Sequence, residues 1–273
     1  MGGGNSIKNY MRFVAIEDSQ INLTSINIAT READNSVDLK HSKDGVTWTQ
    51  YNFNPIPLAA GETLYLKGNN ENGFSNDIRV CSFGDTPISN VDDTLSTGKF
   101  ECHGNIMSLL YGDDFEDKTT IPSTRCFFYL FRNCTLTTAP ELPATTLANY
   151  CYSHMFNGCD SLTTAPELPA TTLSSGCYSN MFLSCWNLTT APELPATTLV
   201  SECYNQMFYD CRSLNHITML ATDISASNCL KDWVYGVSPT GTFVKHPDMT
   251  SLPTGTSGIR YGWTVIDYDY NVG

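Results

Sequence analysis

The chain has little positive charge. Its 273 residues contain 15 Lys and Arg against 28 Asp and Glu, a formal net charge of −13 at pH 7. A chain with this balance repels the phosphates of nucleic acids and the headgroups of anionic membranes. We therefore expect no nucleic-acid partner.

Long apolar runs and an export signal are missing as well. No apolar stretch approaches the roughly 18–20 residues that span a bilayer, so we expect no membrane insertion. Residues 1–6 lack the basic and apolar regions of a signal peptide. We expect an extracellular protein, either exported and without its leader or released in a virion by lysis. Residues 1–10 are interpreted as a flexible lead or a cloning scar.

The sequence also lacks the motifs of common catalytic sites. It contains no Gly-rich phosphate loop and no nucleophile elbow, and its eleven cysteines do not follow the Cys-x2-4-Cys spacing of zinc sites. His154 falls at a repeat position that Asn180 and Gln206 hold elsewhere, so we expect it to face solvent. The prediction is no enzyme and no cofactor. A thiol-dependent enzyme is the alternative, and it would require a His partner for a cysteine.

What the chain does have is one phrase written three times. Leu-Thr-Thr-Ala-Pro-Glu-Leu-Pro-Ala-Thr-Thr-Leu is followed each time by Cys-Tyr-x-x-Met-Phe-x-x-Cys, with a period of 26 residues. We call these the first copy (136–159), the second copy (162–185) and the third copy (188–211). Residues 126–134 form a divergent copy upstream, and a decaying copy follows toward Cys229. A fixed period in the twenties predicts stacked repeats that share one core.

Each copy predicts a strand and a helix. Cys203, Met207, Phe208 and Cys211 lie at i, i+4, i+5 and i+8, which is typical of one face of a short helix. The Thr-rich phrase contains proline, so it cannot be helical throughout, and it predicts a short strand and a turn. A strand and a helix in 26 residues is leucine-rich-repeat geometry.

The phrase Met-Phe-x-x-Cys-x-x-Leu and the repeat length resemble the BspA-type leucine-rich repeats of bacterial surface proteins, common in gut Bacteroidetes and in phages of that community. Segments 241–245 and 258–265 resemble the terminal segment of such arrays. The resemblance implies adhesion or recognition and brings no catalytic residues with it.

The N-terminal residues predict a different unit. Short alternating runs, each a candidate strand, lie at 12–16, 21–28, 37–40, 46–51, 62–66, 78–83 and 99–102. Asp44-Gly45 between two of them is a hairpin signal. Several short strands with turns suggest an antiparallel β-sandwich.

We therefore predict an α+β protein with three structured parts. The β-sandwich covers 11–101, and a leucine-rich-repeat solenoid with an N-terminal cap covers 102–230. A β C-terminal cap, with strands at 242–245 and 263–266, covers 231–273. The N-terminal cap is expected to include a short helix at 104–112.

Nine of the cysteines lie in the repeats, where they should form ladders of buried, reduced thiols. Eight residues along a helix rise about 12 Å, too far for a disulfide within one Cys-x7-Cys pair. Some disulfide elsewhere is an alternative, and Cys81 with Cys102 is one candidate pair.

Two surfaces are candidates for binding. The first, the Glu column, is made by Glu141, Glu167 and Glu193, which should lie about 5 Å apart if the copies stack in register. It predicts either a solvated acidic stripe or a track for a basic ligand or a weakly held calcium ion. The second, the variable patch, is made by Trp186, Tyr209 and Arg212, at positions where the copies differ. An aromatic and arginine patch suits sugar stacking or a protein hot spot.

The expected function is non-catalytic recognition or adhesion, through binding of a surface glycan or a surface protein. The expected location is a bacterial cell surface or a virion, and a phage tail part would be a trimer. The alternative is a purely structural protein of a virion or surface layer.

Overall fold

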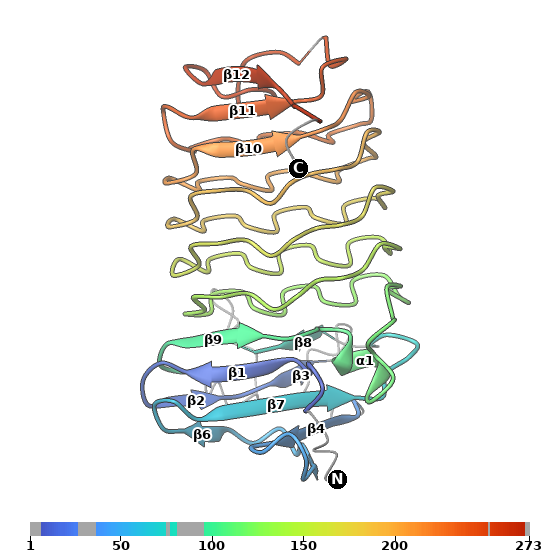
Figure 1. The fold of residues 1–273 in the computed structure, drawn as a ribbon, viewed down its shortest axis with the longest axis vertical. Coiled ribbons are helices and arrows are strands. Elements are labelled where there is room, and N and C mark those ends of the chain that lie inside the picture. Colours follow the sequence, from blue (N-terminus) through green and yellow to red (C-terminus); the bar gives the residue numbers. More distant parts are fainter. Residues whose placement is uncertain (1–6, 27–36, 75–76, 81–95, 251, 271–273) are drawn as a thin grey trace.

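The structure is a computed structural model that describes residues 7–26, 37–74, 77–80, 96–250 and 252–270. Figure 1 shows an elongated molecule with the N-terminal strands at one end, the repeats above one another in the middle, and the C-terminal strands at the other end. Among the repeats, chain order follows the long axis, so each copy lies between its sequence neighbours.

Nine strands precede residue 104 among the described residues. They are β1 (Arg12–Ala15), β2 (Ser19–Ile21), β3 (Thr24–Ile26), β4 (Leu39–Ser42), β5 (Thr49–Gln50), β6 (Ile56–Leu58), β7 (Thr63–Gly68), β8 (Asp77–Arg79) and β9 (Phe100–His103). β1, β7 and β9 lie within two residues of predicted runs. Parts of two other predicted runs, 27–28 and 81–83, lie outside the described residues.

Five of these strands form an antiparallel sheet in the order β5-β4-β7-β1-β9. β2 pairs with β6 and β3 pairs with β8 in two further antiparallel pairs. Alternation along β1 and β7 turns the paired residues Phe13 and Leu64 into the core. The expected sandwich is therefore corrected to one five-stranded sheet with two small, two-stranded ones.

The hairpin between β4 and β5 is confirmed at Asp44-Gly45. Asp44 Oδ1 accepts hydrogen bonds from the backbone N–H groups of Val46 (2.8 Å) and Thr47 (2.7 Å). Gly45 has φ 72°, a left-handed conformation that glycine adopts without steric cost.

Helix is almost absent. Among the described residues the only helix is α1 (Ser108–Tyr111), which falls inside the predicted 104–112 segment. The predicted α+β class is therefore wrong, because the described chain is nearly all β-structure, bridges and turns.

The Cys-Tyr-x-x-Met-Phe-x-x-Cys segments are runs of turns and not helices. In the first copy, Met155 N–H donates to Tyr152 O, three residues earlier (3.1 Å), whereas the next N–H, of Phe156, donates to Met181 O of the second copy (2.9 Å). A helix would keep both donors within its own segment. Over nine positions, a period of four buries the same side chains as a period of 3.6, so the apolar spacing could not separate the two structures.

Left-handed backbone at every fourth residue makes these turns. In the first copy Tyr150, His154 and Gly158 have φ of 55°, 57° and 74°. Only one of the three is glycine, so composition gave no signal of this conformation. The hydrogen bonds to the next copy hold the non-glycine residues there.

The Thr-rich phrases align as single parallel bridges, Thr138 with Thr164 and Thr164 with Thr190. After β9, full strands within the described residues form only beyond the third copy, as the parallel sheet of β10 (His216–Met219), β11 (Thr242–Lys245) and β12 (Thr264–Asp267). The strand predicted at 242–245 is confirmed, and the one at 263–266 is shifted by one residue. Since the copies contain neither a helix nor a full strand, the predicted leucine-rich-repeat solenoid is also wrong.

One apolar core runs through the whole molecule. Phenylalanine rings stack along it at centroid distances of 5.5, 5.5 and 5.8 Å, in the order Phe131, Phe156, Phe182 and Phe208. A second column contains Tyr152, Tyr178 and Tyr204, at 6.0 and 6.1 Å. Equivalent side chains therefore pack on one another, copy upon copy.

Most cysteines are buried free thiols, as predicted. The free ones are Cys102, Cys126, Cys151, Cys159, Cys177, Cys185, Cys203, Cys211 and Cys229. Cys134 is the exception in the repeats, because it is disulfide-bonded. The alternative pair of Cys81 with Cys102 is not formed, since Cys102 is free, and Cys81 itself lies outside the described residues.

β9 connects the N-terminal sheet to the repeats. It pairs antiparallel with β1, and its Phe100 forms a parallel bridge to Leu136 of the first copy. Cys102 N–H also donates to Thr138 O (2.9 Å). The domain boundary predicted between 101 and 102 thus falls inside a strand that belongs to both parts.

Candidate binding face

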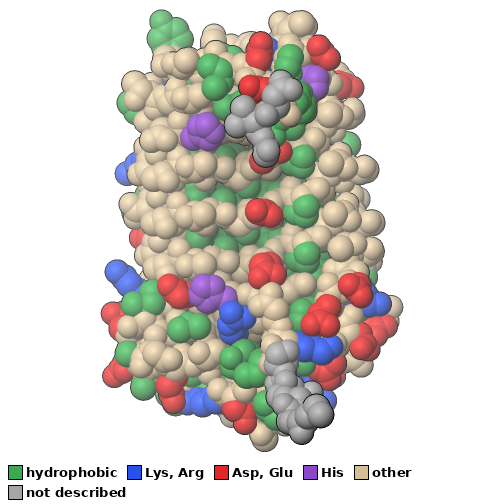
Figure 2. Space-filling model, viewed as in Figure 1, with side chains coloured by type: hydrophobic (Ala, Val, Ile, Leu, Met, Phe, Trp, Pro, Cys, Tyr) green, Lys and Arg blue, Asp and Glu red, His purple; other side chains and the backbone are tan. Residues whose placement is uncertain are grey.

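The Glu column lies on an exposed face of the stack. Each glutamate follows a proline and precedes a buried leucine, so the backbone turns the leucine inward and the carboxylate outward. The parallel bridges of the neighbouring threonines set the copies at a step of about 4.8 Å. Figure 2 shows acidic side chains in a row along this face, with hydrophobic side chains beside them.

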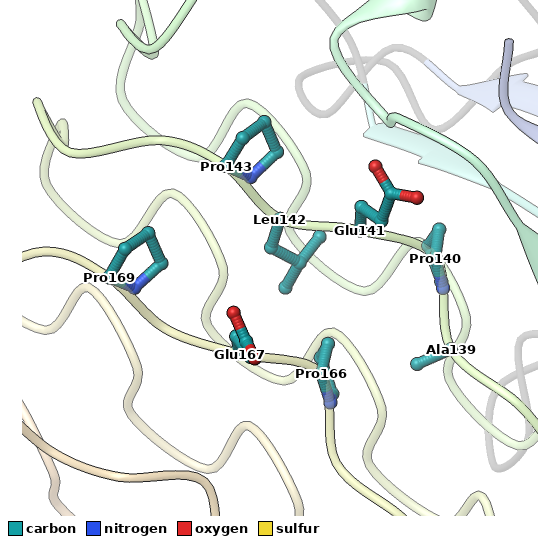
Figure 3. Close-up of a pocket in the computed structure, with 8 residues that line it drawn as sticks. All are labelled: Ala139, Pro140, Glu141, Leu142, Pro143, Pro166, Glu167 and Pro169. Atoms are coloured by element: carbon teal, nitrogen blue, oxygen red, sulfur yellow. The ribbon is translucent and has the colours of Figure 1, made fainter. Parts of the chain in front are cut away.

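A pocket of about 320 Å³ opens between the first two members of the column. Its lining residues come from two neighbouring copies and are Ala139, Pro140, Glu141, Leu142, Pro143, Pro166, Glu167 and Pro169. Figure 3 shows prolines on both sides of each glutamate, with the two carboxylates on adjacent segments. The pocket therefore combines two negatively charged acceptors with rigid apolar walls.

The chain itself engages both ends of the column. Asn9 donates from Nδ2 to both carboxylate oxygens of Glu141, at 2.8 and 2.9 Å. Tyr268 donates from its hydroxyl to Glu193 Oε2 at 3.3 Å. No hydrogen bond joins Glu167 to the described part of the chain, so its carboxylate is the one left open to a ligand.

The structure gives no support to the calcium alternative. Within the described residues, no group of three or more His, Cys, Asp or Glu side chains is placed to hold a metal ion. Calcium usually takes six to eight oxygen ligands, and a single row of exposed carboxylates on separate copies does not enclose an ion.

The variable patch divides into two contacting pairs. Trp186 is 43% exposed, and the Arg212 guanidinium lies over its ring at 5.0 Å. Arg212 also donates to both carboxylate oxygens of Asp210, at 3.0 and 2.9 Å. Tyr209 is half-buried and stacks on Tyr235 at 4.6 Å. Tyr235 was not among the residues predicted for this patch, although it follows Tyr209 by one period.

His154 does not face solvent freely, contrary to the prediction. Its side chain is half-buried, and burial together with the positive charges of Arg132 and Arg79 lowers its pKa to about 4. In the next copies the same column continues as a side-chain hydrogen bond from Asn180 Nδ2 to Gln206 Oε1 at 2.9 Å. His154 itself packs against the rings of Phe128 (5.5 Å) and Tyr129 (4.8 Å) of the preceding copy, so contacts between copies surround this position.

The buried thiols are poorly suited to nucleophilic chemistry. Burial raises the pKa of Cys126 and of Cys203 to about 12. Cys159 and Cys185 donate to the carbonyl oxygens of Phe131 (2.9 Å) and Phe156 (3.1 Å). The reactive form of cysteine is the thiolate, which these surroundings disfavour.

Comparison with protein families, with curated proteins and with solved structures found no match to this chain. Among the described residues, no helix has the length and apolar character needed to cross a bilayer.

Proposed function

We propose that this chain is a non-catalytic recognition module that holds a surface glycan along the Glu column. The observation that carries the proposal is the pocket between Glu141 and Glu167, because it joins hydrogen-bond acceptors to apolar proline surface in one hollow. A sugar offers hydroxyl donors around an apolar ring face. A few polar groups set in apolar walls is the usual composition of a small-ligand site.

The repeat favours an extended polymer over a single sugar. Thr163 and Thr189, four residues before Glu167 and Glu193, are exposed and offer hydroxyl groups that both donate and accept. A polymer that runs along the stack would meet the same groups at each step of about 4.8 Å. Parallel bridges of Thr164 with Thr138 and with Thr190 tie this segment to the copies on either side before binding, which lowers the entropy lost on association.

The variable patch supports a second candidate, binding of a surface protein. Trp and Arg are enriched in the residues that dominate protein interfaces, and Trp186 with Arg212 offers both on one exposed spot. Loss of binding on substitution of Trp186, with the Glu column intact, would favour this candidate.

A thiol-dependent enzyme is disfavoured by the raised pKa of the buried thiols. The resemblance of the repeat phrase to bacterial surface proteins supports an extracellular setting, on a bacterial cell surface or in a phage tail. A purely structural role in a virion or surface layer is the alternative that a complete lack of binding would favour.

A glycan array that carries host mucin sugars and bacterial surface polysaccharides tests the proposal. We expect binding to at least one polymer, and it should persist in a calcium chelator because the described residues form no cluster that could hold a metal ion. Binding to bacterial polysaccharide would indicate a phage receptor-binding part, and binding to host sugars an adhesin. No binding to any glycan would contradict the proposal.

A further inference from the structure

The apolar core is open at the C-terminal end of the stack. Along one inward column the exposed fraction rises from 0% at Ile217 in β10 to 1% at Phe243 in β11 and 41% at Val265 in β12. In the next column Val244 is 9% exposed and Ile266 is 47% exposed. The final strand therefore does not close the core as a polar capping repeat would.

The backbone of β12 is open on the same side. β12 pairs with β11, and within the described residues no strand pairs with its other edge. Figure 1 shows β12 at the extreme end of the molecule. Apolar side chains on an open strand edge form a template for another strand. At the opposite end, β5 has only two residues, Thr49 and Gln50, and both are polar and exposed.

We propose that a second copy of this chain docks on β12, strand against strand, about a two-fold axis at Val265. The axis is normal to the sheet, so residues that lie opposite one another share a face of the sheet. Antiparallel pairing about this axis places Val265 of each copy opposite Val265 of the other, and Thr264 of each copy opposite Ile266 of the other. A single contact of this kind covers the columns that end at Val265 and Ile266 in both molecules. Both copies use the same surface, so the interface is isologous and the assembly closes at two copies.

The flanks of β12 fit the same axis. Tyr261 lies before the strand and Tyr270 after it, and they are 78% and 61% exposed. Tyr261 lies four residues before the axis and Tyr270 five residues after it, so antiparallel pairing brings Tyr261 of one copy near Tyr270 of the other. Charge is also complementary, because Arg260 precedes the strand whereas Asp269 follows it. A parallel arrangement would instead place like charges together.

The mismatch between the two ends of the stack argues against head-to-tail growth. β5 has no apolar side chain, and its edge is too short to receive β12 from another molecule. A second β12 provides an apolar edge of matching length. The inference does not depend on glycan binding, because the Glu column and the β12 edge are separate surfaces with separate variants.

Sedimentation velocity over a range of protein concentrations tests the proposal. We expect a monomer–dimer equilibrium in the unmodified chain and at least about a tenfold rise of the dimer dissociation constant in Ile266→Lys, which places a charge in the interface. Tyr261→Ser should weaken the dimer as well. Val46→Lys is the matched control, since Val46 is 69% exposed at the opposite end, and it should leave the dimer unchanged.

Three outcomes would overturn the proposal. They are a monomer at every concentration, a trimer or open-ended assembly, and a dimer that Ile266→Lys does not weaken. Thermal unfolding of each variant checks that it is folded, and the exposed Tyr261 provides an independent variant if Ile266→Lys is not.

Discussion

Tyr150 and Glu202 are hydrogen-bonded at 2.8 Å, from the tyrosine hydroxyl to Oε2, although they lie 52 residues apart in the first and third copies. Gly176 of the second copy lies between them. The Tyr150 ring passes so close to Gly176 that an added Cβ would clash with Cδ1 and Cε1 of the ring. One side chain thus ties three successive copies together, and glycine provides the space for it.

Gly176→Ala should therefore displace the Tyr150 ring and lower the free energy of unfolding by about 1–3 kcal/mol, the usual range for overpacking. Urea unfolding measures the loss. Part of it will come from the left-handed backbone at Gly176, where φ is 60°. The double variant Tyr150→Ala/Gly176→Ala separates the two causes, because the added alanine should cost less once the ring is gone. Equal costs in both backgrounds would refute the clash.

Phe182→Ala should lower the free energy of unfolding by about 3–5 kcal/mol, because it leaves a cavity in a fully buried column. Phe182 stacks between Phe156 and Phe208, so both neighbouring copies lose a contact. Trp186→Ala is the control, four residues later and on the surface. Its loss should be far smaller, and similar losses in the two variants would count against the stacked core.

His154 should make stability depend on pH in mild acid. Its pKa is about 4 when folded and 6.5 in its unperturbed state, so between these values the unfolded chain binds a proton that the folded chain does not. Stability is fully present above pH 6.5 and falls as the pH is lowered toward 4, by at most about 1.4 kcal/mol per pH unit.

Chemical unfolding of the unmodified chain and of His154→Gln across this range checks the prediction. Glutamine is already present two column positions further on, at Gln206, so the variant should pack. The difference between the two stabilities should shrink as the pH falls. A difference that does not change with pH would show that His154 titrates normally, and His246→Gln serves as the control.

Much of the packing could be predicted from the repeat, and the local backbone could not. The 26-residue period identified the columns that contain the glutamates and the cysteines, because equivalent residues of stacked copies must meet. The apolar spacing of Cys203, Met207 and Phe208 indicated the buried face correctly and the helix wrongly. A run of turns with a period of four satisfies the same spacing, and most of its left-handed residues are not glycines.

Contacts between segments that are distant in the sequence could not be predicted. Nothing in the sequence indicated that Asn9 and Tyr268, near opposite ends of the chain, would bond to the two ends of the Glu column. The prolines that form the pocket walls were visible in the repeated Pro-Glu-Leu-Pro phrase, but their role depends on the gap between copies. The assignments of the Glu column and the variable patch as binding residues stay predictions.

The buried thiols should destabilise the fold in alkali. Cys203 has its pKa raised by burial from 9.0 to about 12, so above pH 9 the unfolded chain loses a proton that the folded chain keeps. Stability is present below pH 9 and is lost as the pH rises toward 12, by at most about 1.4 kcal/mol per pH unit for each such thiol. Unfolding free energies at pH 8 to 10.5 should show a smaller slope in Cys203→Ala. An unchanged slope would indicate that Cys203 ionises normally in the folded state.

The most direct test of the account is the binding of the unmodified chain, Glu167→Gln and Glu71→Gln to one immobilised polysaccharide chosen from the array. Glu167 lines the pocket and Glu71 is an exposed carboxylate of the N-terminal part, so the two substitutions make the same chemical change at different places. We predict that Glu167→Gln weakens binding at least about tenfold, a loss of about 1.4 kcal/mol, and that Glu71→Gln has no effect. Equal affinities for all three proteins would contradict recognition through the Glu column.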